Sequence, residues 1–259
     1  MTMQQTQRPL QDVTVLVTRP ERRAAGLCQM IEQAGGLALQ FAAIEINQPA
    51  DVQSREYARD HISEFALAIF ISPTAVEKTF EFLTALPAGI RTSAIGSRTA
   101  HALELMGLNI DVVPDGHDTE SLLEHPLMQT RMIAGGKIVI FRGEGGRELL
   151  GDTLQSRGAE VFYADMYRRS PPTSARQLDQ YLAQADIITV SSNQGLQNLY
   201  DLTTDKTSLT RHFLVVPGER SFTLAKVLGF SNIFVAENAT DAACMNALEY
   251  ATAKMSKKS

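Results

Sequence analysis

One extended segment most constrains what this chain can fold into. Residues 158–172 read GAEVFYADMYRRSPP, and no turn residue interrupts the run from Ala159 to Ser170. That run is about twice as long as an average strand. Pro171 and Pro172 then end it, because proline has no N–H group to donate within a sheet. We interpret the first half as the last strand of a sheet and the second half as an extended connector that leaves the sheet.

The alternation within this segment predicts how its side chains divide between the two faces of the strand. Successive side chains of a strand point in opposite directions. Tyr167 is therefore expected on the face of Tyr163 and Asp165, opposite Ala164 and Met166.

A second segment has the same form. Residues 37–49 (LALQFAAIEINQP) begin as a strand, continue as a long extended tail and end at a proline. Two such connectors predict a chain that leaves one lobe and later returns to it. We expect one discontinuous α/β lobe over residues 1–44 and 169–259 and a second over residues 45–168, with crossings near 42–49 and 164–172.

Strands and helices alternate along the rest of the chain. Short apolar runs rich in β-branched residues, each followed by an amphipathic helix, occur at 13–18, 67–71, 137–141 and 186–190. Such runs are typical of strands that are buried on both faces in a parallel sheet. A further short strand is expected at 110–113. The pattern predicts an α/β protein with two parallel-sheet lobes, each covered by helices on both faces.

The two halves of the chain also align with each other. Thr18-Arg19 aligns with Phe141-Arg142, and Pro49 with Pro171, at an offset of roughly 120 residues that is far longer than the period of a solenoid repeat. This alignment favours an internal duplication, although the rhythm of strands and helices alone would produce part of such a match.

Composition argues against several classes of protein. The chain has 259 residues, 44% of them hydrophobic and 20% charged, without the run of about 18 apolar residues that would span a membrane. The net charge is −5 and there is no basic block, which argues against nucleic-acid binding. Residues 1–12 lack the apolar core of a signal peptide, and Cys28 and Cys244 are too few for a disulfide framework or a zinc site. We expect a cytoplasmic monomer with two buried thiols and no membrane or nucleic-acid partner.

The candidate site lies where the predicted strands end. In open α/β sheets, ligands bind outside the carboxyl ends of the strands, and here small hydroxyl residues and glycines stand at those ends, just before helices. Backbone N–H groups and the helix dipole at such turns favour carboxylate or phosphate. The alternative is that each hydroxyl simply caps its helix. The candidate ligand-binding residues are Thr18, Arg19, Ser72, Thr74, Gly96, Ser97, Thr99, Arg142, Gly143, Ser191, Ser192, Asn193 and Gly218, with Arg98, Arg147 and Arg220 nearby.

Other catalytic motifs do not appear in the sequence. The run from Gly143 to Glu148 departs from a dinucleotide-binding fingerprint, because Glu148 stands where the third glycine belongs. The five histidines show neither metal-ligand spacing nor a paired nucleophile. Tyr167 remains, on the expected connector, where it would project between the lobes. A phenol has a pKa of about 10 in water, so it is protonated at neutral pH and can donate a proton. The alternative is an ordinary aromatic side chain packed at the end of a strand.

The order of several motifs resembles one family. They are VLVTRP, IFISPTAV, AIGSRTA, VVPDGHDTESLL, IVIFRGEGGRELLGDTLQSRGAEV, YRR from Tyr167, VSSNQGLQNLY, VVPGERSFTLAKVLGF and VAENATDAACMNAL. From about Val13 to about Leu248 the chain is similar to the uroporphyrinogen-III synthase family. The resemblance implies two flavodoxin-like α/β lobes joined by a two-stranded extended connector.

The resemblance also implies a reaction. The family's substrate is hydroxymethylbilane, a linear tetrapyrrole with acetate and propionate carboxylates. The family removes the terminal hydroxyl, closes the ring through a spiro intermediate and inverts ring D, in the tetrapyrrole biosynthesis that leads to haem, sirohaem and cobalamin. The resemblance implies no cofactor and no metal. The expected partners are the substrate and, transiently, the enzyme that makes it.

Roles for individual residues follow from the same resemblance. The family's functionally important tyrosine matches Tyr167, which is expected to act as a general acid. The family's ligand-facing turns match Ser72–Thr74, Gly96-Ser97, 191–193 and Gly218. The last turn departs from the pattern, because an acid, Glu219, stands where the sister turn has Ser97.

Two other functions remain open from the sequence. One is a non-enzymatic two-lobed protein that binds an anion or a sugar, which a secretion signal would favour. The other is a flavodoxin-like redox module, which would be coloured by bound flavin.

Overall fold

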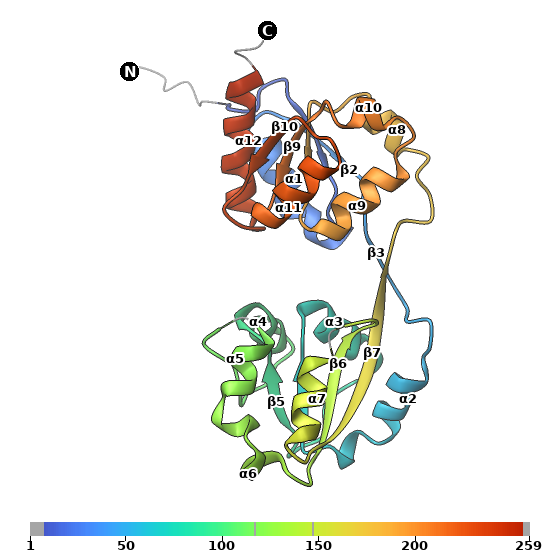
Figure 1. The fold of residues 1–259 in the computed structure, drawn as a ribbon, viewed down its shortest axis with the longest axis vertical. Helices are drawn as coiled ribbons and strands as arrows, with labels where there is room; N and C mark the ends of the chain where they lie inside the picture. Colours follow the sequence, from blue (N-terminus) through green and yellow to red (C-terminus); the bar gives the residue numbers. More distant parts are fainter. Residues whose placement is uncertain (1–7, 117, 147, 256–259) are drawn as a thin grey trace. The chain divides into compact units, whose positions relative to one another are not determined.

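The computed structural model describes residues 8–116, 118–146 and 148–255. The chain divides into two compact units, which are considered one at a time below. Unit 1 comprises Met1–Glu45 and Ser170–Ser259, and unit 2 comprises Ile46–Arg169. In each unit, helices cover both faces of a five-stranded sheet (Figure 1).

The sheet of unit 1 has the strand order β10-β9-β8-β1-β2, and all of its neighbouring strands are parallel. Numbered along the chain within the unit, this is the order 2-1-3-4-5 of flavodoxin-like sheets. The chain adds β2 on one side of β1 and then β8, β9 and β10 on the other, so the switch point of the sheet lies between β1 and β8. The strands are β1 (Thr14–Val17), β2 (Leu37–Gln40), β8 (Ile187–Thr189), β9 (Phe213–Val216) and β10 (Asn232–Val235).

Successive residues of β1 contribute to two different core layers of unit 1. Val15 and Val17 pack in a cluster with α1 (Glu21–Gln33) and α12 (Asp241–Met255). Leu16 packs in the cluster on the other face of the sheet. The helices of that second layer are α8 (Leu178–Leu182), α9 (Asn193–Leu202), α10 (Lys206–Leu209) and α11 (Glu219–Val227).

The sheet of unit 2 has the strand order β3-β7-β6-β4-β5. The pairs β4–β5, β4–β6 and β6–β7 are parallel, and the switch point lies between β4 and β6. The strands are β3 (Glu45–Asn47), β4 (Leu67–Phe70), β5 (Arg91–Ala94), β6 (Lys137–Gly143) and β7 (Glu160–Ser170).

The core of unit 2 also has two layers. Phe70, Phe141 and Ala164 pack with one set of helices, and Ile69 and Ile140 with the other. The first set is α2 (Gln53–Asp60), α3 (Pro73–Phe82) and α4 (Ser97–Leu105), and the second is α5 (Thr119–Glu124), α6 (Thr130–Ile133) and α7 (Leu149–Ser156). Two 3-10 helices, Ile62–Glu64 and Pro126–Met128, complete the unit.

The long segment is strand β7 from Glu160 to Ser170, so regular strand structure extends through the half that was expected to be only a connector. β7 lies between β6 and β3, and its pairing with β6 ends at Tyr167, opposite Gly143. Residues 37–49 form two short strands, β2 and β3, instead of one strand with an extended tail. The expected strand at 110–113 is also wrong, because only Val112 pairs, in an isolated bridge with Ser93.

The face assigned to Tyr167 is wrong as well, and the reason is a break in the register of β7. Arg142 lies opposite Asp165, but Gly143 lies opposite Tyr167, so Met166 is an extra residue on β7. A bulge of this kind reverses the alternation of side chains. Met166 and Tyr167 therefore both pack in the layer of α3 and α4.

The predicted fold class is confirmed, with two five-stranded, mostly parallel sheets whose helices lie on both faces. Among the residues that the structure describes, none of the helices has the length and the apolar character needed to cross a bilayer.

Candidate functional site

The carboxyl end of the unit 2 sheet brings the predicted tyrosine to the start of α3. The Tyr167 hydroxyl lies 3.1 Å from Ser72 Oγ, and Arg169 Nη2 donates to it at 3.4 Å. Ser72 is the N-cap of α3, where its Oγ accepts a hydrogen bond from the Ala75 amide at 3.0 Å. Tyr167 is only 3% exposed, so its phenol is held within the protein beside the switch point of the sheet.

Gly143 makes the position of Tyr167 possible. A Cβ atom at Gly143 would lie 2.7 Å from Cζ and 3.0 Å from the hydroxyl oxygen of Tyr167. The ring therefore occupies the space in which any other residue at 143 would carry its side chain. The Glu144 amide also donates to the Tyr167 carbonyl at 2.8 Å, which holds β7 against β6 beyond the register break.

Arg142 is turned toward the opposite layer from Tyr167. Its Nε donates to Asp165 Oδ1 at 2.8 Å, and its guanidinium carbon lies 3.8 Å from the centre of the Tyr163 ring. Burial raises the pKa of the Tyr163 hydroxyl, although Arg142 opposes this shift. The structure thus places Arg142, expected to bind an anion, in an ion pair with a carboxylate of its own sheet.

The other predicted residues of unit 2 lie at the starts of α3 and α4. Thr74, in the first turn of α3, is buried, as is Thr99 in the first turn of α4. Gly96 is the N-cap of α4 and provides no side-chain cap, while Ser97 is exposed beside it. The amides in the first turn of a helix have no partner within that helix. A ligand at α4 would therefore meet backbone donors and the Ser97 hydroxyl.

In unit 1, the first two predicted residues are used to hold the fold together. Thr18 Oγ1 donates to the Thr189 carbonyl at 2.7 Å, which joins β1 to β8 at the switch point. Arg19 forms an ion pair with Asp241, and its Nη2 donates to the Ala239 carbonyl at 3.2 Å. The guanidinium thus ties the end of β1 to the start of α12.

The remaining predicted residues of unit 1 surround the starts of α9 and α11. Ser191 lies in the turn after β8, and Ser192 caps α9 by accepting from the Gly195 amide at 3.1 Å. Asn193 Oδ1 accepts from the buried hydroxyl of Ser221 at 2.6 Å, which connects the two helix starts. Gly218, with φ of 154°, begins α11 without a side-chain cap.

Some residues of this edge were not predicted from the sequence. Asp165, Asp241 and Ser221 each hold a predicted residue in place. A charged residue among the apolar residues 161–166 is a signal that could have indicated Asp165, because a partly buried carboxylate needs a partner. Of the other arginines, Arg98 and Arg220 are exposed, and Arg147 lies outside the described residues.

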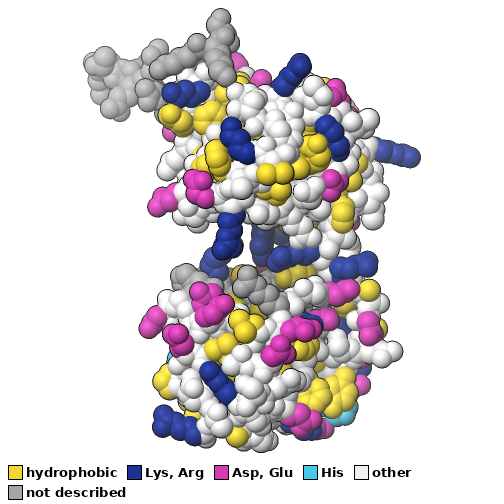
Figure 2. All heavy atoms as spheres, in the orientation of Figure 1, with side chains coloured by type: hydrophobic (Ala, Val, Ile, Leu, Met, Phe, Trp, Pro, Cys, Tyr) yellow, Lys and Arg dark blue, Asp and Glu magenta, His cyan; other side chains and the backbone are white. Residues whose placement is uncertain are grey.

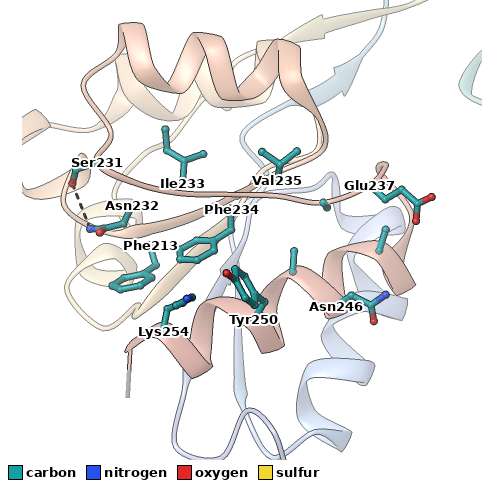
Figure 3. A pocket seen from close by; sticks show the side chains of 13 residues that line it. Phe213, Ser231, Asn232, Ile233, Phe234, Val235, Glu237, Asn246, Tyr250 and Lys254 are labelled. Atoms are coloured by element: carbon teal, nitrogen blue, oxygen red, sulfur yellow. Dashed lines mark hydrogen bonds between the residues drawn. The ribbon is translucent and has the colours of Figure 1, made fainter. Parts of the chain in front are cut away.

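A hollow of about 600 Å³ lies elsewhere in unit 1, along β10 and the facing side of α12. In Figure 3, Phe213, Phe234 and Tyr250 approach one another on one side of β10, and Ile233 and Val235 point to the other side. None of the predicted site residues lines this hollow. We therefore place the candidate functional residues at the carboxyl ends of the strands within each unit, and not at this hollow.

Charges are mixed on the surface of unit 1. Figure 2 shows basic, acidic and apolar side chains interspersed on its visible face.

Within residues 8–116, 118–146 and 148–255, no three His, Cys, Asp or Glu side chains are grouped as a metal ion would require.

Comparison with known proteins is consistent across most of the chain. The family model of uroporphyrinogen-III synthase HemD matches residues 26–246. The chain is 32% identical to the uroporphyrinogen-III synthase of Salmonella typhimurium over 248 residues, which cover 92% of this chain and 100% of that protein. It has the same identity and coverage with the Escherichia coli enzyme. It is also 31% identical to a putative uroporphyrinogen-III synthase of Methanothermobacter thermautotrophicus. That match covers 72% of this chain and 76% of the relative.

Solved structures share the fold. A mutant uroporphyrinogen III synthase of the extreme thermophile Thermus thermophilus superposes with a TM-score of 0.60 at 19% identity and covers 93% of this chain and 99% of its own. The synthetase of Helicobacter pylori also gives a TM-score of 0.60, at 13% identity, covering 90% of this chain and 97% of its own. The family model and the relatives of 32% identity, which span nearly the whole chain, show that it belongs to the uroporphyrinogen-III synthase (HemD) family.

Proposed function

We propose that this protein converts hydroxymethylbilane into uroporphyrinogen III, with Tyr167 as the proton donor to the leaving hydroxyl. The family match over residues 26–246 carries the assignment of the reaction. The placement of the Tyr167 hydroxyl against Ser72 and Arg169 supports its assignment as the acid.

The hydrogen bonds of Tyr167 suit a proton donor. Arg169 Nη2 can only donate, so the phenolic oxygen accepts that bond. Ser72 Oγ already accepts from Ala75, and its own hydrogen is free to point at Tyr167. With both neighbours donating, the phenolic hydrogen is left for the substrate. The same two donors then stabilise the phenolate that forms when the proton leaves.

The Tyr167 hydroxyl can supply the proton that the reaction consumes and later take up the proton that it releases. The phenol gives its proton to the terminal hydroxyl, the carbon–oxygen bond breaks and water leaves. The methylene carbon that remains is electrophilic, and the substituted α-carbon of the terminal pyrrole attacks it to form the spiro intermediate. The older bond from that α-carbon to its bridging methylene then breaks, and this methylene bonds to the free α-carbon on the other side of the same pyrrole, which inverts the ring. That carbon loses its proton as the pyrrole is restored, and the phenolate takes the proton back. The reaction thus needs one group that gives a proton and later recovers one.

The helix starts suit the carboxylates of the substrate. α3 and α9 are capped by Ser72 and Ser192, whereas α4 and α11 begin at Gly96 and Gly218 without a side-chain cap. A helix that begins with glycine leaves its first amides to a ligand and lets that ligand approach closely. We assign these starts to acetate and propionate groups, which neutral backbone donors and the helix dipole bind well. Such contacts hold the chain in the geometry that closes the inverted ring.

The proposal includes a cytoplasmic monomer that takes its substrate from the preceding enzyme by transient contact. The relatives' shared name supports the substrate class. Sedimentation of the purified protein with and without the preceding enzyme tests the assembly state: a single species of one chain is expected, and a stable dimer contradicts it.

Substitution of Tyr167 by Phe tests the assignment of the acid. Phe keeps the ring above Gly143, so the protein is expected to fold, and the rate of type III formation is expected to fall by roughly 10²- to 10⁴-fold. The products are separated by chromatography, because uncatalysed closure gives the unrearranged isomer. Tyr163→Phe is the control, since it removes a hydroxyl from the same strand but on the opposite face.

The outcomes distinguish the proposed reaction from the proposed role of Tyr167 as its acid. If the wild-type protein gives no type III isomer, the proposed reaction is wrong, and binding of the bilane without turnover would favour a binding protein. If Tyr167→Phe forms the type III isomer at the wild-type rate, only the role of Tyr167 is wrong.

A further inference from the structure

The register of β6 and β7 changes next to an ion pair. From Lys137 and Glu160 onward the two strands stay in step until Arg142 lies opposite Asp165. The next residue of β6, Gly143, lies opposite Tyr167, so the extra residue of β7 is Met166. The last pair before the break is therefore the pair whose side chains form the Arg142–Asp165 ion pair.

Both members of this ion pair are held firmly. Arg142 is 9% exposed, its Nε donates to Asp165 at 2.8 Å and its guanidinium covers the Tyr163 ring. Among the described residues its Nη1 has no hydrogen-bond partner, so Asp165 is the group that compensates its charge. On the other side of β7, the Asp165 amide donates to Ser54 Oγ at 3.2 Å.

A second contact holds the strands beyond the break. There the Glu144 amide donates to the Tyr167 carbonyl at 2.8 Å. On β7, Met166 is the residue between the ion pair at Asp165 and this hydrogen bond at Tyr167. The two contacts therefore confine the extra residue to one position, and the Tyr167 ring lies over Gly143 as a result.

Without the ion pair, the extra residue is no longer confined. A Gly-rich stretch specifies register weakly, and here Gly143 ends β6 while Gly145 and Gly146 lie in the turn after it. The break can then move toward the amino end of β7, or it can close and return Tyr167 to the face of Tyr163. Either change alters the backbone beside Tyr167 and the distance from its hydroxyl to Ser72.

We propose that Arg142 and Asp165 are positioning residues, whose ion pair fixes the register break and thereby aims the Tyr167 hydroxyl. This inference rests on the proposed role of Tyr167 in the reaction. It assigns the pair a role without contact to the substrate, because Arg142 is turned to the layer opposite the tyrosine.

The test combines kinetics with hydrogen exchange. Asp165→Ala removes the charge and the acceptor, whereas Asp165→Asn keeps an acceptor oxygen for Arg142 Nε. We expect kcat for the type III isomer to fall by roughly 10²-fold in Asp165→Ala, the cost of a displacement of about 1 Å. Asp165→Asn is expected to recover part of the loss, and KM to change less than kcat. The Glu144 amide should exchange faster in both variants.

The same substitutions made in Tyr167→Phe measure how far the effect of Asp165 on the rate depends on the Tyr167 hydroxyl. If Asp165 acts through the tyrosine, Asp165→Ala changes the residual rate there by less than about 2-fold. Glu64→Ala is the control, because it removes the 2.6 Å ion pair with Lys137 at the other end of β6. It should change neither kcat nor exchange at Glu144.

Two results overturn the inference. One is an equal loss of kcat when Asp165→Ala is made in the wild type and in Tyr167→Phe. The other is unchanged hydrogen exchange of the Glu144 amide in Asp165→Asn, which is the variant to use if Asp165→Ala does not fold. If Tyr167→Phe alone is fully active, the proposed acid fails instead, and faster exchange at Glu144 still shows that the ion pair sets the register.

Discussion

The hydroxyl oxygens of Ser72 and Tyr167 lie 3.1 Å apart, although 95 residues separate them in the chain. Ser72 follows β4 and Tyr167 lies near the end of β7, and β6 stands between these two strands in the sheet. The phenol reaches across the end of β6 because the residue beneath it, Gly143, has no side chain. The position of the Tyr167 hydroxyl therefore depends on the packing of β4, β6 and β7 and on the absence of a side chain at Gly143.

Gly143→Ala is expected to reduce activity by displacing the tyrosine. The new Cβ would lie 2.7 Å from Tyr167 Cζ, closer than real Cβ contacts, so the ring must move. We expect kcat to fall by roughly 10²-fold, measured as type III isomer formed. Gly146→Ala is the matched control, since its Cβ would meet its nearest atom at 3.5 Å, an ordinary contact. Equal activity of the two variants would show that the ring position does not matter.

Ser72→Ala is expected to affect both stability and rate. Loss of the N-cap bond to Ala75 should cost about 1 kcal/mol of unfolding free energy, and loss of the contact with Tyr167 should lower kcat. Asp205→Ala separates the two effects, because Asp205 caps α10 in the same way, accepting from the Ser208 amide, but is not part of the site. Urea unfolding should show similar losses, with kcat reduced only in Ser72→Ala. A normal kcat in Ser72→Ala would remove Ser72 from the catalytic group.

Asp241→Ala is expected to destabilise unit 1. The substitution leaves the buried Arg19 guanidinium without its carboxylate, but Asp241 is 36% exposed, so solvent weakens the effect. We expect a loss of roughly 1–3 kcal/mol in unfolding free energy, below the range for fully buried pairs. Asp60→Ala, which breaks the exposed pair with Arg59, should change it by less than about 0.5 kcal/mol. Equal midpoints in urea for the two variants would contradict the structural role of Arg19.

Cys244 is expected to make the protein less stable in alkali. Burial raises the pKa of its thiol from 9.0 to about 11. Between these values the unfolded chain loses a proton that the folded chain keeps, so this contribution is complete below pH 9 and is lost as pH rises to about 11. The loss is roughly 2–3 kcal/mol. Cys244→Ala lacks it, so its unfolding free energy should fall less steeply across this window. Parallel curves would show that the thiol ionises freely in the folded protein.

The sheets were predictable because each buried strand carries its own signal. Residues 67–71 are apolar, and all four residues of β4 are buried. Helix α2 was not predicted, because Ala58 is its only buried residue and no apolar periodicity marks it. Residues 110–113 (IDVV) are the opposite case, because their β-branched residues favour a strand but only Val112 pairs with the sheet.

The site was predictable only in part. The strand ends and their hydroxyl residues follow from local sequence, and Ser72 and Ser192 do cap helices. The face of Tyr167 does not follow from local sequence. It depends on a register break beside a pair of residues 23 positions apart, Arg142 and Asp165, and alternation along β7 alone predicts the wrong side.

The extra residue in β7 also affects how relatives of different length should be aligned. In a chain that lacked Met166, the aspartate would still face Arg142, and the tyrosine would follow at once, opposite Gly143, with ordinary pairing. Two lengths of this strand thus lead to one location of the phenol. A one-residue gap beside this tyrosine in an alignment is therefore no sign that the tyrosine has been lost from its place.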